Sequence, residues 1–136
     1  MRTIAILIAR LIFAYVFAQA AVFKFMLVGM DSTAAEIAAA GFANPMLLAW
    51  IAAIFEIALA VAFLTGLFFR DAAVVAAVYV LFLGFSFHGP DRWSDNMMEF
   101  GFFIDHFVFI AGLLLAAVHG PGDTLVPGSK FTSRSS

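Results

Sequence analysis

The chain lacks cysteine entirely, and this absence removes several kinds of chemistry. None of its 136 residues is a cysteine, which excludes a thiol nucleophile, a disulfide, a Cys-ligated zinc, an iron–sulfur cluster and a covalently attached c-type haem. Seven Lys and Arg against nine Asp and Glu give a net charge of -2. This balance provides no basic surface for nucleic acid, so we expect no nucleic-acid partner.

Charged residues of both signs are also scarce. They make up 12% of the chain, while hydrophobic residues make up 65%. A soluble domain is about a quarter charged and about half apolar, so this chain has too few charges to cover a water-soluble surface. Its apolar surface must contact a lipid bilayer. Four spans of about 20 residues with short loops nearly use up the length.

Four apolar stretches are separated by Gly, Pro and charged residues. The predicted spans cover about residues 4–28, 46–69, 72–88 and 97–118. Arg70-Asp71 would form a tight connection between the second and third spans. A short interfacial helix is expected over Thr33–Ala40, because Asp31-Ser32-Thr33 ahead of Glu36 resembles an N-cap with a capping box. The sequence predicts an all-α, up-down bundle of four membrane helices over 1–119, followed by a flexible tail over 120–136.

The N-terminus has some features of a secretory signal peptide. Arg2 precedes an apolar run, and Ala18-Gln19-Ala20 is a small-x-small triplet. However, Arg10 would interrupt the apolar core of such a signal, and the apolar pattern continues to Val28. We therefore expect this segment to be retained as the first span.

The distribution of Lys and Arg predicts the orientation. If the N-terminus is cytoplasmic, five of the seven fall on that side: Arg2, Arg10, Arg70, Lys130 and Arg134. The opposite side has only Lys24 and Arg92. The positive-inside rule then places both termini in the cytoplasm, and Arg10, near the inner end of its span, could extend to water.

Small and polar residues recur at helical spacing on one face of each span. Membrane helices pack through small residues because lipid tails are as apolar as Leu. We expect these faces to turn inward and the many Phe and Leu to contact lipid. The predicted faces are Arg10, Ala14, Ala21 and Lys24; Ala49, Ala53, Glu56 and Ala60; Ala73, Ala77, Gly84 and His88; and Gly101, Asp105, Gly112 and Ala116.

Glu56 is the most informative single residue. It lies about 15 Å from the outer end of its span at about 1.5 Å per residue. An acid at the centre of a span costs about 2.5–3.5 kcal/mol on insertion scales, and such residues usually mark a binding site or an ion pathway. A structural alternative is a protonated carboxyl group that only holds two helices together.

Five polar residues fall in the outer half of the predicted bundle: Lys24, Glu56, His88, Asp105 and His106. We expect them to line one cavity that binds a ligand, with Glu56 and Asp105 as candidate proton-relay groups. No catalytic residue is identified. The alternative is that Asp105-His106 is a structural pair that contacts Lys24 and closes the outer mouth of the bundle.

Haem and metal sites are disfavoured by the pattern. His88 and His106 lie on neighbouring spans, but their depths differ by one to two turns and no haem motif is present. A metal site could be drawn from His88, Asp91, Asp95, Glu99 and His106. An exposed acidic loop is the commoner explanation of acids at four-residue spacing, so we expect no metal.

Several of these residues resemble the pattern of the DoxX family of small bacterial membrane proteins. The resemblance extends over nearly the whole chain, from Ile4 to Pro127. The most specific part is Glu56 followed by Gly66-Leu67-Phe68-Phe69-Arg70-Asp71-Ala72-Ala73; Arg10, Phe23-Lys24-Phe25, His88 and Gly120-Pro121-Gly122 also match. Asp105-His106 departs from the Lys-Asn often found there, and Thr124-Leu125-Val126 departs from Ser-Leu-Asp.

The resemblance implies a multi-pass protein of the bacterial inner membrane, related to subunits of quinone-coupled oxidation and of oxidative-stress complexes. We expect an accessory subunit of such an oxidoreductase system without activity of its own, binding a quinone in the polar pocket. A small proton-linked transporter and a structural scaffold are the alternatives. A narrow bundle also suggests partner subunits or a homo-oligomer.

Overall fold

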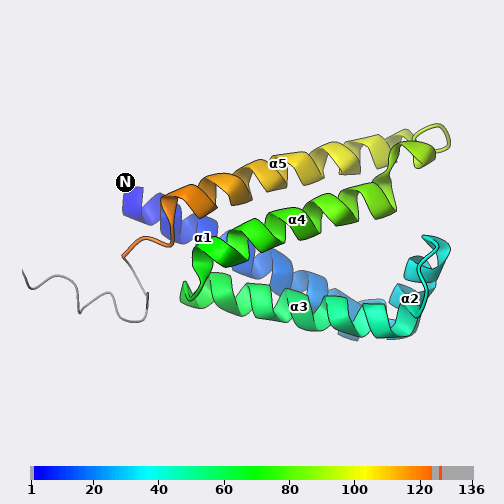
Figure 1. Cartoon of the computed structure of the whole chain (residues 1–136), viewed down its shortest axis with the longest axis horizontal. Helices are drawn as coiled ribbons and strands as arrows, with labels where there is room; N and C mark the ends of the chain where they lie inside the picture. The colour runs from blue at the N-terminus through cyan, green and yellow to red at the C-terminus, as the bar shows by residue number, and fades with distance from the viewer. Residues whose placement is uncertain (1, 124–125, 127–136) are drawn as a thin grey trace, which may run out of the picture. The chain divides into compact units, whose positions relative to one another are not determined.

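The computed structural model describes residues 2–123 and 126. This part of the chain is helical and contains no strand. Four of its helical segments are long and apolar enough to cross a membrane (Figure 1), namely Thr3–Leu27, Pro45–Thr65, Phe69–Arg92 and Met97–His119. The predicted all-α fold with four membrane spans is thus confirmed. Most of the predicted tail, 120–136, lies outside the described residues.

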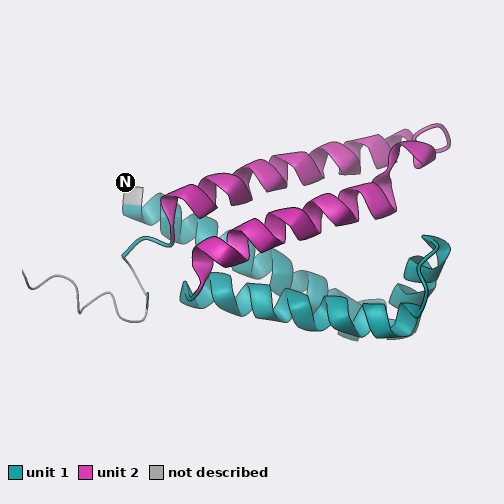
Figure 2. Cartoon of the chain, in the orientation of Figure 1, with its two compact units in different colours: residues 1–67, 121–136 teal, residues 68–120 magenta. Residues whose placement is uncertain are grey.

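The chain divides into two compact units (Figure 2). The first comprises Met1–Leu67 together with Pro121–Ser136, and the second comprises Phe68–Gly120. Each unit is built on a pair of long helices packed against one another. The two units are described in turn.

In the first unit, α1 (Arg2–Val22) packs against α3 (Pro45–Thr65). The last turn of the first span is a π-helix, η1 (Phe23–Leu27), in which the Val28 N–H donates to the Phe23 carbonyl oxygen at 2.9 Å. The short helix α2 (Met30–Ala39) follows and packs on α3.

The start of α2 differs from the prediction. Gly29, at φ 87°, is the N-cap, and no side chain caps the helix. The predicted capping box at Asp31-Ser32-Thr33 is therefore wrong, because the turn at Gly29 allows the helix to begin at Met30. Thr33 Oγ1 donates instead to the Gly29 carbonyl oxygen at 3.1 Å.

The connection between the second and third spans is also earlier than predicted. Gly66, at φ 76°, donates its N–H to the Ala62 carbonyl oxygen at 2.8 Å and ends α3. This left-handed conformation favours glycine. Because α4 (Phe69–His88) starts at Phe69, Arg70 and Asp71 lie in its first turn rather than between the helices.

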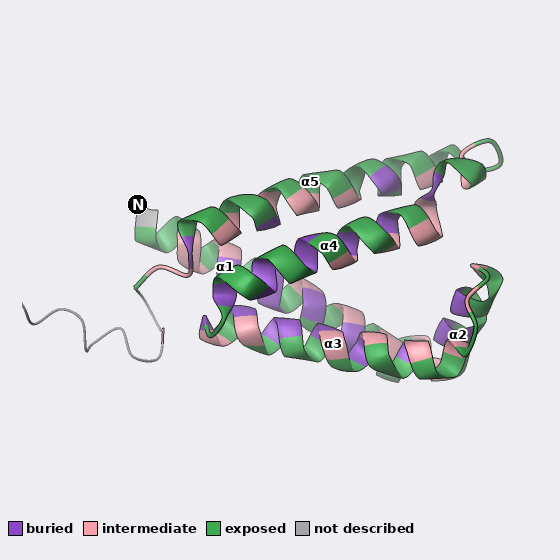
Figure 3. Cartoon of the chain, viewed as in Figure 1, coloured by how far each residue is buried: buried purple, intermediate pink, exposed green. Residues whose placement is uncertain are grey.

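The core of the first unit follows the predicted faces. The buried members are Arg10, Ala14, Ala21, Ala49, Ala53, Glu56 and Ala60 (Figure 3). Phe63 adds an aromatic contact that the small-residue pattern did not predict. Its ring centroid lies 5.3 Å from that of Phe13 and 5.7 Å from that of Phe17.

In the second unit, α4 packs against α5 (Met97–His119), and a short 3-10 turn, Pro90–Arg92, lies between them. Ala73, Ala77 and Gly84 on α4 are buried as predicted. The predicted face of α5 is wrong at Gly101 and Asp105, which are exposed, while Gly112 and Ala116 are half-buried.

Phe103 and Leu113 are the buried residues of α5. Aromatic contacts explain this choice of face. The Phe103 ring centroid lies 5.0 Å from Phe85, 5.2 Å from Trp93 and 5.0 Å from Phe107. Large rings thus supply the α4–α5 contact at this level, where small residues had been expected.

Candidate functional site

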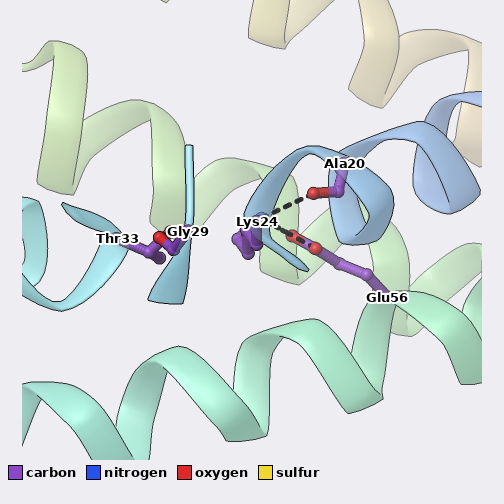
Figure 4. Close-up of polar contacts among 5 residues, drawn as sticks. All are labelled: Ala20, Lys24, Gly29, Thr33 and Glu56. Carbon is purple, nitrogen blue, oxygen red and sulfur yellow. Dashed lines mark hydrogen bonds and ion pairs between the residues drawn. The ribbon is translucent and has the colours of Figure 1, made fainter. Parts of the chain in front are cut away.

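The first unit contains an ion pair between two of the predicted site residues (Figure 4). Lys24 Nζ lies 2.8 Å from both Oε1 and Oε2 of Glu56, and 3.4 Å from the Ala20 carbonyl oxygen, to which it also donates. A lysine ammonium has three N–H donors. These three contacts can use all of them, and the one to Ala20 is the longest.

The two partners differ in how much of their surface is exposed. The Glu56 side chain is 2% exposed, while that of Lys24 is 20% exposed. Removing one partner of a buried pair leaves an uncompensated charge, which costs several kcal/mol. The Glu56 carboxylate is therefore the more buried partner of the pair, and the Lys24 ammonium is the more exposed one.

The backbone around Lys24 is unusual. Lys24 lies in the π-helical turn η1, and Gly29 follows with a positive φ. Single π turns within α-helices are rare and are found frequently at functional sites. Nothing in the sequence pattern of span one distinguishes this turn from a regular α-helix, so sequence reasoning missed it.

Arg10 lies inside the first unit rather than extending to water. Its side chain is 1% exposed. Its contacts include the carbonyl oxygens of Phe63 at 3.3 Å, Leu64 at 2.9 Å and Pro121 at 3.2 Å, to which the guanidinium donates. The last turn of a helix has carbonyl groups without intrahelical donors. Arg10 therefore closes the C-terminal end of α3, and the expected snorkelling is wrong.

In the second unit, His88 pairs with Glu99, an acid that the sequence suggested only as part of a disfavoured metal site. His88 Nδ1 lies 2.5 Å from Glu99 Oε2, and these side chains are 27% and 20% exposed. The His88 carbonyl oxygen accepts from Trp93 Nε1 at 3.0 Å. The short connection from the end of α4 to the first turn of α5 was the available clue, because it brings Glu99 back to His88.

His106 also lies close to His88, with 5.2 Å between the ring centroids. His106 Nδ1 contacts the Phe102 carbonyl oxygen at 2.7 Å. Asp105, in contrast, is exposed, and no hydrogen bond or ion pair of its carboxylate is found in the described part of the chain. The five predicted residues thus include two close pairs, Lys24–Glu56 and His88–His106, one in each unit. Their grouping around a single cavity stays a prediction.

Comparison with known proteins gives one positive result. No curated protein and no solved structure matches the chain. The family model described as DoxX matches residues 5–89, which is more than half of the 136 residues. The matched range includes Lys24, Glu56 and His88 but ends before Asp105 and His106. On this match, the chain belongs to the DoxX family.

Proposed function

We propose that this DoxX protein is an accessory subunit of a quinone-linked oxidoreductase system in a bacterial inner membrane, with both termini in the cytoplasm. The observation that carries the proposal is the Lys24–Glu56 pair, in which a carboxylate that is 2% exposed meets an ammonium that is 20% exposed. Ionisable groups inside membrane spans usually serve binding or proton transfer. Redox partners would come from other subunits of the complex.

The contacts of Lys24 suggest how a quinone head group would bind. Exchanging the 3.4 Å contact with the Ala20 carbonyl oxygen for a quinone carbonyl leaves both 2.8 Å contacts to Glu56 in place. Glu56 holds the Lys24 ammonium in place through its two 2.8 Å contacts while the third N–H is exchanged. The pair therefore offers a hydrogen-bond donor, Lys24, to a quinone carbonyl, and Glu56 positions that donor.

The test measures the quinone that co-purifies with the protein from native membranes, as moles per mole of chain by mass spectrometry. Lys24→Met and Glu56→Gln should each lower the ratio about tenfold, the factor that corresponds to about 1.4 kcal/mol. Gln19→Ala is the matched control, because Gln19 is an exposed polar residue on the same helix. It should leave the ratio unchanged.

Wild-type quinone content in both Lys24→Met and Glu56→Gln would overturn the proposed site. The same preparation identifies co-purifying proteins, which tests the accessory role. Recovery of the chain with no redox subunit, from membranes solubilised under several mild conditions, would argue against that role.

A proton-linked transporter is the second candidate, because buried acid–base pairs within spans are also typical of proton relays. Reconstituted liposomes with an imposed pH gradient distinguish the two functions. A transporter acidifies the lumen on its own and loses this flux in Glu56→Gln, whereas an accessory subunit gives none. A scaffold predicts that substitutions at Lys24 and Glu56 change abundance alone.

The predicted contacts of His88, Asp105 and His106 with the same ligand are tested in the same assay. Each is replaced separately by Ala, and the quinone ratio is compared with that of Gln19→Ala. A decrease at any of them would extend the site beyond the Lys24–Glu56 pair.

A further inference from the structure

In the second unit, His88 and His106 each use Nδ1 in a hydrogen bond and, among the residues that the structure describes, leave Nε2 without one. His106 Nδ1 contacts the Phe102 carbonyl oxygen at 2.7 Å, and a carbonyl can only accept, so Nδ1 carries the proton. His88 Nδ1 contacts the Glu99 carboxylate at 2.5 Å, which likewise holds a proton on Nδ1. When such a ring is neutral, its Nε2 has a lone pair.

This arrangement is typical of histidines that bind metal ions. A metal-ligating histidine almost always donates its other ring N–H to a carboxylate or a backbone carbonyl, which fixes the tautomer and the ring orientation. His88 has the first kind of partner and His106 has the second. Within the described residues, neither Nε2 makes a hydrogen bond.

The separation of the rings agrees with one shared ion. Zinc binds imidazole nitrogen at about 2.0–2.1 Å with tetrahedral angles, which places two ligating ring centroids about 5 Å apart. The centroids of His88 and His106 are 5.2 Å apart, with an interplanar angle of 48°. Gly84 packs against His106, since a Cβ at this position would lie 3.3 Å from the His106 Cβ and Cγ atoms.

We propose that His88 and His106 bind one divalent transition-metal ion through their Nε2 atoms, with Glu99 and the Phe102 carbonyl orienting the rings. No group of three or more His, Asp or Glu residues in the described ranges is placed to hold a metal. The remaining coordination positions therefore belong to water or a small exogenous ligand. Lys24 and Glu56, the pair that carries the proposed quinone function, take no part in this site, so loss of metal binding and loss of quinone at that pair are separate outcomes.

The ligand type predicts which ions bind. Imidazole suits zinc, copper and nickel, whereas magnesium and calcium prefer oxygen ligands. Copper(II) is the tightest binder in the divalent series and gives an electron paramagnetic resonance spectrum that reports its nitrogen ligands. It is therefore the probe, with Zn²⁺ as a competitor and Mg²⁺ as a negative control.

The experiment titrates the full-length protein, without a histidine tag, with Cu²⁺ in detergent micelles. We expect one ion per chain with two imidazole nitrogens, displaced by excess Zn²⁺ and unaffected by Mg²⁺. His88→Ala and His106→Ala should each leave one nitrogen and weaken binding at least about tenfold. Glu99→Gln should weaken binding about 10–100-fold while keeping both nitrogens, the signature of an orienting residue.

His119→Ala is the matched control. His119 makes the same contact as His106, from Nδ1 to the carbonyl oxygen four residues earlier, at 2.9 Å, but belongs to no proposed site. It should bind Cu²⁺ like the wild type. Gly84→Ala keeps both imidazoles and should weaken binding by displacing His106, which tests the geometry even if a histidine variant fails to fold.

Unchanged affinity and nitrogen count in both His88→Ala and His106→Ala would overturn the proposal. Loss of the two-nitrogen signal in His119→Ala would overturn it equally, because the ion would then bind elsewhere.

Discussion

The long helices of each unit form a helical hairpin, α1 with α3 and α4 with α5. In both hairpins an arginine of the first long helix donates to backbone carbonyls in the last turn of the second. In the first unit, Arg10 of α1 donates to the carbonyl oxygens two and three residues before Gly66. In the second, Arg70 of α4 donates to the carbonyl oxygens of Val118 at 2.9 Å and Ala117 at 3.3 Å, two and three residues before Gly120. The φ angles of the two glycines are 76° and 79°.

The two arginines differ in burial. Arg10 is 1% exposed, whereas Arg70 is exposed. A hydrogen bond contributes little net stability where water can replace it, but a buried polar group left without a partner costs its full desolvation free energy. The comparison therefore teaches that burial, rather than the number of bonds, decides how much an arginine cap stabilises its hairpin.

The largest expected effect comes from removing the two arginines. Arg10→Ala removes the donor from the buried carbonyl of Phe63 and the part-buried carbonyl of Leu64. It should lower the free energy of unfolding by about 3–6 kcal/mol, since hydrogen bonds to charged groups contribute about 1.5–3 kcal/mol each. Arg70→Ala should cost about 1 kcal/mol, because water can replace the guanidinium. Reversible unfolding by SDS in mixed micelles measures both.

Arg10→Lys is the control for charge. It keeps one cation but has fewer donors and no planar fork, so its stability should lie between those of the wild type and Arg10→Ala. Equal losses in Arg10→Ala and Arg70→Ala would refute the role assigned to burial.

The ion pairs of the two units sharpen the comparison. Glu56→Leu leaves the Lys24 ammonium without its partner and should destabilise by about 3–4 kcal/mol. The double variant Lys24→Met with Glu56→Leu should recover most of this loss, because an apolar pair of similar volume often replaces a buried ion pair without cost. Both variants are compared in the same SDS titration.

Glu99→Gln is the counterpart in the second unit. His88 and Glu99 are 27% and 20% exposed, so solvent screens their interaction and the loss should stay below about 1 kcal/mol. The double variant at Lys24 and Glu56 also has an outcome that would contradict the expectation. If it is no more stable than Glu56→Leu alone, the loss in Glu56→Leu comes from the missing Lys24–Glu56 interaction itself and not from the Lys24 charge left unpaired.

The two C-terminal glycines should differ by a smaller amount. An L-residue in the left-handed region costs about 1–2 kcal/mol, so Gly120→Ala should lose about that much. Gly66→Ala should lose about 1 kcal/mol more, because its Cβ would lie 3.1 Å from Val126 Cγ2 and 3.3 Å from Pro121 Cβ. At Gly120 the nearest atoms belong to the exposed Arg70 side chain, which can move aside.

Thermal unfolding of both alanine variants in micelles measures this difference. Equal losses would mean that backbone strain alone accounts for both positions, with no contribution from the packing around Gly66.

The span positions and the inward faces of α1, α3 and α4 were predictable because length, hydropathy and small-residue spacing depend on local sequence. The same spacing predicted the wrong buried residues in α5. Phe103 is buried there because its ring contacts Phe85 of α4 and Trp93 of the α4–α5 connection, which the sequence of α5 alone does not show. Helical spacing correctly predicted that Lys24 and Glu56 lie on inward faces, but it did not predict the π-helical turn that contains Lys24. The partners of Arg10 depend on how helix ends meet, which no local pattern encodes, whereas the short α4–α5 connection was a clue to the contact between His88 and Glu99.

The smallest expected effect distinguishes the starts of α3 and α5, the second long helix of each hairpin. Asn96 is the N-cap of α5, and its side chain accepts from the Met98 N–H at 3.1 Å. Asn44 is the N-cap of α3 at φ 53° and makes no side-chain cap. Asn96→Ala should therefore cost about 1 kcal/mol, and Asn96→Asp should restore most of it.

Asn44→Gly should change the free energy of unfolding by no more than a few tenths of a kcal/mol, because glycine adopts the left-handed conformation at Asn44 without strain. The same SDS titration compares both sites. A loss at Asn44 as large as that in Asn96→Ala would mean that the Asn44 side chain has a role beyond allowing this backbone conformation. Pro45 has no N–H at the first position of α3, so that helix has one fewer backbone donor to satisfy than α5 has. The same residue type therefore serves two purposes at the two N-caps: Asn44 allows a left-handed backbone conformation, and Asn96 accepts a hydrogen bond.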